Sequence, residues 1–179
     1  MLKGKQVLLR SAEKRDVHFF HDMWSDEELR KYDGTYLIPP SKESVLENFN
    51  KIMNINKKYL SIINEKEVLV GYITYEEAKD LGGNYILGIT IAKRFWNRGY
   101  GEDAIRTLLK FLFMSKGAHR IELEVVDFND RAINCYLKCG FQKEGVRRKR
   151  YFSEGQYRDI IIMGILKEEY FKQNNILAE

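Results

Sequence analysis

A glycine turn at the start of a long helix constrains this sequence more than any other feature. Residues 97–101 read Asn-Arg-Gly-Tyr-Gly, and a strand-like run at 84–92 stands shortly before them. After the turn, apolar residues at 104–112 recur at intervals of three and four, the spacing of an amphipathic helix. Gly117 supplies the stop of that helix. The centre of the chain is therefore predicted to be a strand, a glycine turn and a helix in succession.

Further strand and helix patterns on both sides of this unit predict one mixed domain. Ser25 and Glu28 have the spacing of a capping box, which opens a short helix. We expect a single α/β (α+β) domain over residues 1–179, with a mixed, mostly antiparallel twisted sheet flanked by helices. Strand patterns occupy 6–10, 59–64, 68–75, 84–92, 120–126, 143–152 and 157–166, and the other helical patterns occupy 13–23, 41–53 and 129–140.

Composition and charge exclude several classes of protein. Hydrophobic residues make up 44% of the chain, as in soluble globular proteins, and no apolar run approaches the roughly 18 residues of a membrane span. The N-terminus shows no signal-peptide pattern, so a cytoplasmic location is expected. The net charge of +4 is too small to indicate nucleic acid by itself, although it suits a small polyanion. The cysteines and histidines lack metal-ligand spacing, so no metal site is expected.

The glycine turn has the chemistry of an anion site. Glycine takes positive φ angles easily, which lets successive backbone N–H groups point inward at the start of a helix. The helix macrodipole favours negative charge at the same place, and Arg98 adds a mobile cation. These features suit a diphosphate. This stretch alone leaves one alternative open: a strand-to-helix turn that is flexible because of its glycines and binds no ligand.

A second stretch, NDRAINCYLKCGF at 129–141, makes the pattern specific. Together with RFWNRGYGEDA in the preceding strand–turn–helix unit, it resembles the GNAT superfamily of acetyl-CoA-dependent N-acetyltransferases. The resemblance covers 88–141 and is strongest for the branch of the ribosomal-protein-alanine and spermidine N-acetyltransferases, which tends to carry a tryptophan where Trp96 stands. It implies transfer of an acetyl group from acetyl-CoA to a primary amine by direct attack, with no metal and no covalent intermediate.

The resemblance assigns the coenzyme A contacts to three segments. Backbone at the end of the strand pairs with the pantetheine arm, the glycine loop binds the pyrophosphate, and an asparagine before the next helix also binds pantetheine. On this basis Gly99→Val is expected to abolish coenzyme A binding, because the new Cβ would enter the phosphate site. By matched position, the cofactor-binding residues are Ile89, Thr90, Ile91, Trp96, Asn97, Arg98, Gly99, Tyr100, Gly101, Glu102, Asn129 and Asn134.

The resemblance also assigns the acid of the reaction but leaves the base open. Tyr136 matches the family tyrosine near the thioester sulfur, where a phenol can protonate or stabilise the leaving thiolate; a packing role is the alternative. Many relatives carry a carboxylate where Ile86 stands here. Glu76, Glu77 and Asp127 could act through water, and we expect no single carboxylate to be indispensable.

The acceptor pocket is expected between the early helices and the last hairpin. Aromatic and acidic walls suit a cationic amine. The acceptor itself stays open among a protein N-terminus, a polyamine, an amino acid and an antibiotic. We expect acetyl-CoA and this amine as partners, no membrane, and pairing of two copies as a homodimer. The candidate acceptor residues are Trp24, Tyr32, Tyr36, Glu77, Tyr151 and Asp159.

Two other functions stay open. The chain could be a non-catalytic acyl-CoA-binding module of the same fold, which the release of free thiol would exclude. The basic residues at 147–150 could instead contact ribosomal RNA, although nucleic acid is not the expected partner. Salt-sensitive RNA binding would support that second function.

Overall fold

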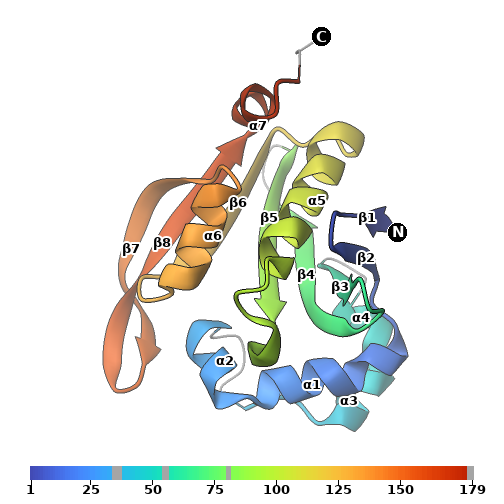
Figure 1. Ribbon diagram of the computed structural model, residues 1–179. Coiled ribbons are helices and arrows are strands. Elements are labelled where there is room, and N and C mark those ends of the chain that lie inside the picture. The colour runs from blue at the N-terminus through green and yellow to red at the C-terminus, as the bar shows by residue number, and fades with distance from the viewer. Residues whose placement is uncertain (34–37, 54–56, 80–81, 177–179) are drawn as a thin grey trace.

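An eight-stranded sheet forms the centre of the computed structural model, which describes residues 1–33, 38–53, 57–79 and 82–176 (Figure 1). Neighbouring strands are antiparallel except for β5 and β6, which are parallel. This confirms the expected mixed, mostly antiparallel sheet. In spatial order the strands are β1 (Leu2–Lys3), β2 (Val7–Ser11), β3 (Lys58–Asn64), β4 (Leu69–Glu77), β5 (Asn84–Ile91), β6 (Arg120–Val126), β8 (Gln156–Leu166) and β7 (Gln142–Ser153).

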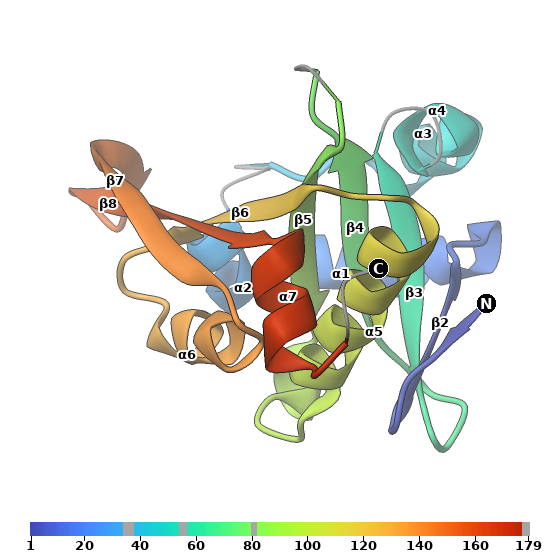
Figure 2. The same ribbon diagram turned by 90° about the horizontal axis from the view of Figure 1, so that it is seen from above.

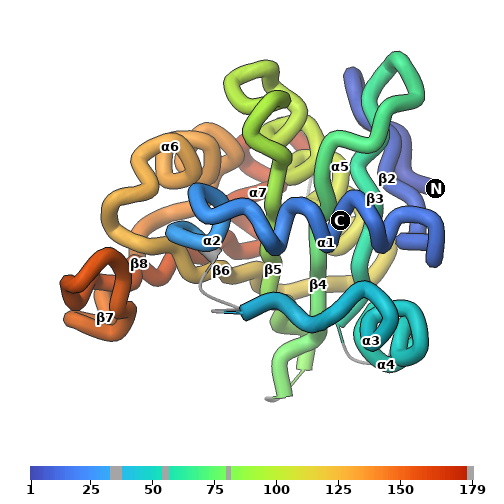
Figure 3. Tube along the Cα trace, turned by 90° about the horizontal axis from the view of Figure 1, so that it is seen from below, coloured from blue at the N-terminus to red at the C-terminus, as the bar shows by residue number. Residues whose placement is uncertain are grey.

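Helices cover both faces of the sheet, as the predicted architecture requires (Figure 2). On one side lie α5 (Tyr100–Ser115), α6 (Asp130–Lys138) and α7 (Lys167–Gln173), and on the other lie α3 (Lys42–Glu47) and α4 (Phe49–Met53). The helix α1 (Val17–Ser25) crosses β4 and β5, and α2 (Glu27–Asp33) follows it toward α6 (Figure 3). Two short 3-10 helices, η1 (Lys14–Asp16) and η2 (Lys93–Phe95), precede α1 and the glycine turn.

Side-chain alternation along β4 divides the core between the two faces. Ile73 packs in the larger apolar cluster with α5, whereas its neighbour Tyr72 packs in a second cluster with α1, α3 and α4. The predicted apolar stripe of α5, which includes Leu108 and Leu112, is fully buried in the larger cluster. Trp24 belongs to the second cluster, which therefore fixes α1 against β4.

A buried ion pair fixes the start of α1. Asp16 is 4% exposed and accepts hydrogen bonds from both terminal nitrogens of Arg10, at 2.6 and 2.7 Å, and from the Ser61 hydroxyl at 2.7 Å. Burial alone would raise the pKa of the Asp16 carboxyl, but the hydrogen bonds from Arg10, Ser61 and the Glu13 backbone, with the charge of Arg10, lower it. The carboxylate therefore ties β2 and β3 to the helix that follows it.

Some element boundaries differ from the predictions. Asp26, and not Ser25, caps α2, because its Oδ1 accepts from the Glu28 N–H at 2.9 Å while Ser25 still belongs to α1. The helix expected at 41–53 is two helices that meet at Asn48. The strand β1 and the helix α7 lie outside the expected elements.

Candidate active site

The site lies where β5 and β6 separate. The two strands pair at three positions, the last of which joins Ile86 to Glu122; beyond it β6 continues beside β8 and β5 continues beside β4 (Figure 1). A cavity of about 640 Å³ occupies the gap and is lined by residues 87–91 of β5 and by Glu124 and Val125 of β6. In the part of the chain that the structure describes, no strand pairs with this edge of β5 beyond Ile86.

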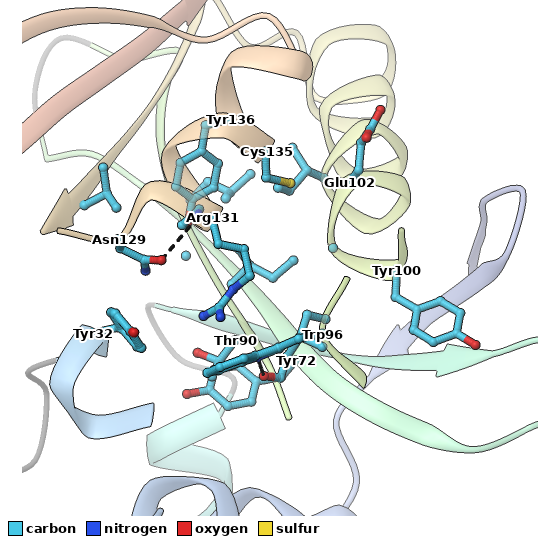
Figure 4. A pocket seen from close by; sticks show the side chains of 18 of the residues that line it. Tyr32, Tyr72, Thr90, Trp96, Tyr100, Glu102, Asn129, Arg131, Cys135 and Tyr136 are labelled. Atoms are coloured by element: carbon cyan, nitrogen blue, oxygen red, sulfur yellow. Dashed lines mark hydrogen bonds between the residues drawn. The ribbon is translucent and has the colours of Figure 1, made fainter. Parts of the chain in front are cut away.

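Strand pairing decides which backbone groups of β5 reach the cavity. The Ala92 N–H donates to the Val70 carbonyl oxygen at 2.9 Å, so every second residue of β5 counted from Ala92 is hydrogen-bonded to β4. Thr90 is one of these, whereas Ile89 and Ile91 direct their N–H and C=O groups to the opposite side, into the cavity. Thr90 reaches the cavity through its side chain (Figure 4). Of the three residues predicted to offer backbone groups to the cofactor, Ile89 and Ile91 therefore direct them into the cavity and Thr90 does not.

The glycine turn closes one end of the cavity. The Trp96 Nε1–H donates to the Ile91 carbonyl oxygen at 2.7 Å and so ties the turn to the end of β5. Asn97 and Gly99 have φ angles of +59° and +82°. Gly99 is the N-cap of α5 and has no side chain with which to cap the helix, so the first N–H groups of α5 stay available to an anion. All the residues predicted for this loop, 96–102, line the cavity.

The left-handed backbone at Gly99 is what requires glycine there. A Cβ built on Gly99 would lie against the Gln6 side chain, 3.3 Å from its Nε2. The expectation that this Cβ would enter the phosphate site stays a prediction; in addition, a side chain would meet Gln6 and strain the φ of +82°. Asp103 fixes the same side of the turn, because its carboxylate accepts from the backbone N–H groups of Lys5, Gln6 and Val7 at 3.0, 2.7 and 3.0 Å.

The helix α6 brings an asparagine and a tyrosine to the opposite wall of the cavity. The Asn129 Oδ1 accepts from the Ala132 N–H at 3.2 Å and caps α6, which leaves the amide nitrogen of Asn129 as a donor (Figure 4). Tyr136 is 7% exposed and lines the cavity, with its ring edge-on to Phe141 at a centroid distance of 6.0 Å. Asn134 also lines the cavity. These residues lie where the predicted contacts need them, and their roles stay predictions.

Aromatic side chains from α1, α2 and the sheet line another part of the cavity. Trp24 and Tyr32 line it, as predicted. The Trp24 Nε1–H donates to the Tyr72 hydroxyl at 3.0 Å, and Tyr59 lies 5.5 Å from Tyr72 between ring centroids. Tyr59 and Tyr72 also line the cavity, and neither was predicted. The alternation of β4 could have indicated Tyr72, since it places this ring on the face opposite Ile73.

Other predicted acceptor residues do not line the cavity. Glu77 is exposed at the end of β4. The Tyr151 hydroxyl donates to the Arg30 carbonyl oxygen at 3.1 Å, and Asp159 accepts from a backbone N–H of β7 at 2.7 Å. The hairpin of β7 and β8 therefore braces α2, and the pocket is not formed between the early helices and this hairpin as expected. Tyr36 lies outside the described residues.

The carboxylates that line the cavity are both ion-paired. Glu102 pairs with Arg106 at 2.9 Å, and Glu124 pairs with Arg147. The structure thus offers no unpaired carboxylate on the described wall to act as a base. The bases considered from the sequence, Glu76, Glu77 and Asp127, are not among the lining residues.

An arginine that was not predicted lies in the middle of the cavity wall. The guanidinium carbon of Arg131 is 3.3 Å from the ring centroid of Trp96 and 5.4 Å from that of Tyr32 (Figure 4). Burial lowers the pKa of the Arg131 guanidinium. Its position in the second place of α6 carries no sequence signal, because its aromatic partners come from distant segments of the chain.

Comparison with known proteins agrees with this geometry. The family model described as acetyltransferase (GNAT) domain matches residues 6–142. The spermidine N(1)-acetyltransferase of Vibrio cholerae is 26% identical over 174 residues, which cover 96% of this chain and 99% of that protein. The L-amino acid N-acetyltransferase AaaT of Escherichia coli is 27% identical over 165 residues, which cover 90% and 99%. The crystal structure of the Vibrio cholerae spermidine enzyme with CoA and spermine has a TM-score of 0.84 at 26% identity and covers 93% of this chain and 98% of that one.

The chain belongs to the GNAT acetyltransferase family. It is an acetyl-CoA-dependent N-acetyltransferase that transfers the acetyl group to a primary amine. Within the described ranges, no group of three or more His, Cys, Asp or Glu side chains is placed to hold a metal ion. None of the helices that the structure describes has the length and apolarity to cross a membrane.

Proposed function

We propose that acetyl transfer takes place in the gap between β5 and β6, with Tyr136 as the acid. The observation that carries this proposal is the position of the gap: the uncapped start of α5 lies at one end of the cavity, and Tyr136 lines its wall. A diphosphate at the start of α5 would be held by backbone N–H groups and Arg98. The pantetheine arm would then run along the free edge of β5 and pair with Ile89 and Ile91, as an added strand does.

Different residues of the cavity take part in the bond changes and proton transfers of the reaction. The amine nitrogen attacks the thioester carbonyl carbon, the C–N bond forms, and the C–S bond breaks. Tyr136 donates its phenolic proton to the leaving sulfur and regains a proton from water, while the protonated nitrogen of the tetrahedral intermediate loses its proton to water. The Ile89 N–H, which points into the cavity, stabilises the oxyanion, while the Ile89 carbonyl oxygen and the Ile91 N–H are left to the pantetheine arm. Since the described wall carries only ion-paired carboxylates, water is the proton acceptor in this scheme.

The acceptor enters from the aromatic end of the cavity. Trp24, Tyr32 and Tyr72 surround this end and give it an apolar, electron-rich wall. Relatives with this domain act on spermidine and on L-amino acids. A small amine of one of these kinds is therefore the acceptor that we propose, ahead of a protein N-terminus. Pairing of two copies as a homodimer stays a prediction.

A panel of amines with acetyl-CoA tests this function. Release of free thiol should depend on the amine, and mass spectrometry should detect the acetylated amine. Thermal unfolding should also shift with acetyl-CoA and not with a short RNA, since a ligand at about 100 times its dissociation constant stabilises by roughly 2.7 kcal/mol. A shift without thiol release would favour the non-catalytic binding module.

A further inference from the structure

The acetyl-transfer scheme gives Arg131, a cation of the cavity wall, no task. Arg131 lines the cavity, with its guanidinium carbon over the Trp96 ring and 5.4 Å from the centroid of the Tyr32 ring (Figure 4). Resting on the proposed function, we propose that Arg131 binds a carboxylate of the acceptor. The substrate is then an amine that also carries a carboxylate, the class of amino acids, and not a polyamine.

Stacking leaves the hydrogen-bonding edge of Arg131 to a ligand. A guanidinium that lies on an aromatic face uses its plane for that contact, and its N–H donors radiate within the plane. Among the described residues, no carboxylate lies within ion-pair distance of Arg131. The charge of Glu28 acts on Arg131 from a distance, but Glu28 is itself ion-paired with Lys93. A carboxylate that accepts two parallel hydrogen bonds from the guanidinium would give this half-buried charge a direct partner.

The charge balance of the cavity opposes a polycation. Four basic side chains line it, and none of the four has a carboxylate within ion-pair distance in the described ranges. The two acidic side chains of the wall, Glu102 and Glu124, are each paired with an arginine outside the lining. The diphosphate takes up Arg98, but the remaining three cations keep the wall positive, so a polyamine would add like charges whereas an amino acid brings a balancing carboxylate. The four basic residues are Lys57, Arg98, Arg131 and Lys138.

The position of Arg131 assigns it to the acceptor rather than to the diphosphate. One of its two ring partners is Tyr32, which comes from α2 at the acceptor end. The diphosphate end already has the open start of α5 and Arg98. A carboxylate on Arg131 would therefore lie between the aromatic wall and the reacting edge of β5, where it can orient the attacking amine.

Amine pairs that differ only in the carboxylate give the test. Lysine is compared with cadaverine, and phenylalanine with 2-phenylethylamine, by the kcat/KM for thiol release from acetyl-CoA. The wild-type protein should prefer the carboxylate-bearing member of each pair by roughly 10- to 100-fold, the range for a hydrogen-bonded charge. Arg131→Met should abolish this preference and leave the KM for acetyl-CoA unchanged. Arg131→Lys keeps the positive charge but loses the two parallel N–H donors of the guanidinium, so it should keep part of the preference.

Arg148→Met is the matched control, because Arg148 is exposed on β7 and does not line the cavity. It should leave the preference as in the wild type. The inference is overturned if spermidine or the decarboxylated amines are the better substrates, or if Arg131→Met raises the KM for acetyl-CoA and keeps the preference. In both cases acetyl transfer itself stands. Absence of thiol release with every amine would overturn the proposed function and this inference with it.

Discussion

The indole nitrogen of Trp96 donates a hydrogen bond to the carbonyl oxygen of Ile91 at 2.7 Å, and this contact joins the glycine turn to the strand that borders the cavity. The same indole ring is the platform on which Arg131 lies. One side chain therefore positions both the glycine turn and Arg131. This double contact is a structural reason for a tryptophan at the position.

Trp96→Phe tests this contact. Phenylalanine keeps a ring for Arg131 but removes the hydrogen bond to Ile91, which should weaken acetyl-CoA binding about fivefold, equivalent to roughly 1 kcal/mol. Calorimetric titration with acetyl-CoA measures the change. Trp96→Leu removes the ring as well and should also reduce the preference for carboxylate-bearing amines. Equal behaviour of both variants and the wild type would show that the turn is held without Trp96.

Tyr136→Phe tests the acid. The variant keeps the buried ring and its packing on Phe141 but cannot protonate the leaving sulfur. We expect kcat to fall about 100-fold, the lower end for a general acid, while the KM for acetyl-CoA stays close to that of the wild type. A change in kcat of less than about threefold would assign Tyr136 to packing alone.

Two glycines at opposite ends of α5 make a matched pair. Gly99 and Gly117 have φ angles of +82° and +69°, so alanine strains the backbone to a similar degree at either position. Gly99→Ala should reduce acetyl-CoA affinity at least tenfold, because the strained turn can no longer hold its N–H groups in place. Gly117→Ala should lower the melting temperature similarly and leave the affinity unchanged. A similar loss of affinity in both variants would trace the effect to stability and not to the turn.

Glu77→Gln tests the absence of an indispensable carboxylate base. Since Glu77 is exposed and does not line the cavity, turnover should stay within about threefold of the wild type. Steady-state assays with saturating acetyl-CoA measure this. A fall of more than about a hundredfold with acetyl-CoA binding intact would identify Glu77 as the base.

Asp16 should make the stability of the protein depend on pH in the acid range. Its folded-state pKa is lowered below the value near 3.9 of an unfolded chain, so its stabilisation is present above that value and is lost as pH falls through the folded pKa. Asp16→Asn should cost about 3 kcal/mol at pH 7, because Arg10 loses its partner. Urea unfolding at neutral pH and near pH 3 measures the difference in the free energy of unfolding between the wild type and Asp16→Asn. This difference should become smaller at the lower pH. If the difference were the same at both pH values, Asp16 would not be the cause of the loss of stability in acid.

Local patterns predicted several strands well, because a strand such as β6 alternates over most of its length between more and less buried residues. The strand β6 has the predicted limits 120–126, and β5 differs from the prediction by one residue. The helix α7 was missed although the predicted strand ended correctly at residue 166 and Glu169 accepts from the Leu166 N–H at 2.9 Å. What holds it is the stack of Tyr170 on Phe113, with ring centroids 4.8 Å apart, and this contact joins residues far apart in the chain.

The cofactor end of the site could be predicted because its residues are consecutive. The turn at 96–102 and the cap Asn129 carry recognisable local motifs, and all of them line the cavity. The proposed acceptor end could be predicted only in part, through Trp24 and Tyr32, because it is assembled from α1, α2, β3, β4 and α6. Asp159 has the residue type that a cationic amine would favour, yet the hairpin uses it for its own backbone. Arg131 was missed for the converse reason, since only the fold brings Tyr32 to it.

Thiol release from acetyl-CoA, measured with and without an amine panel, tests the central claim most directly. The account predicts release that requires both a primary amine and the Tyr136 hydroxyl, with formation of one acetylated amine per thiol. Tight binding of acetyl-CoA without amine-dependent release would contradict it. In that case the gap between β5 and β6 would hold the coenzyme in a binding protein, and Tyr136 would serve only to pack α6.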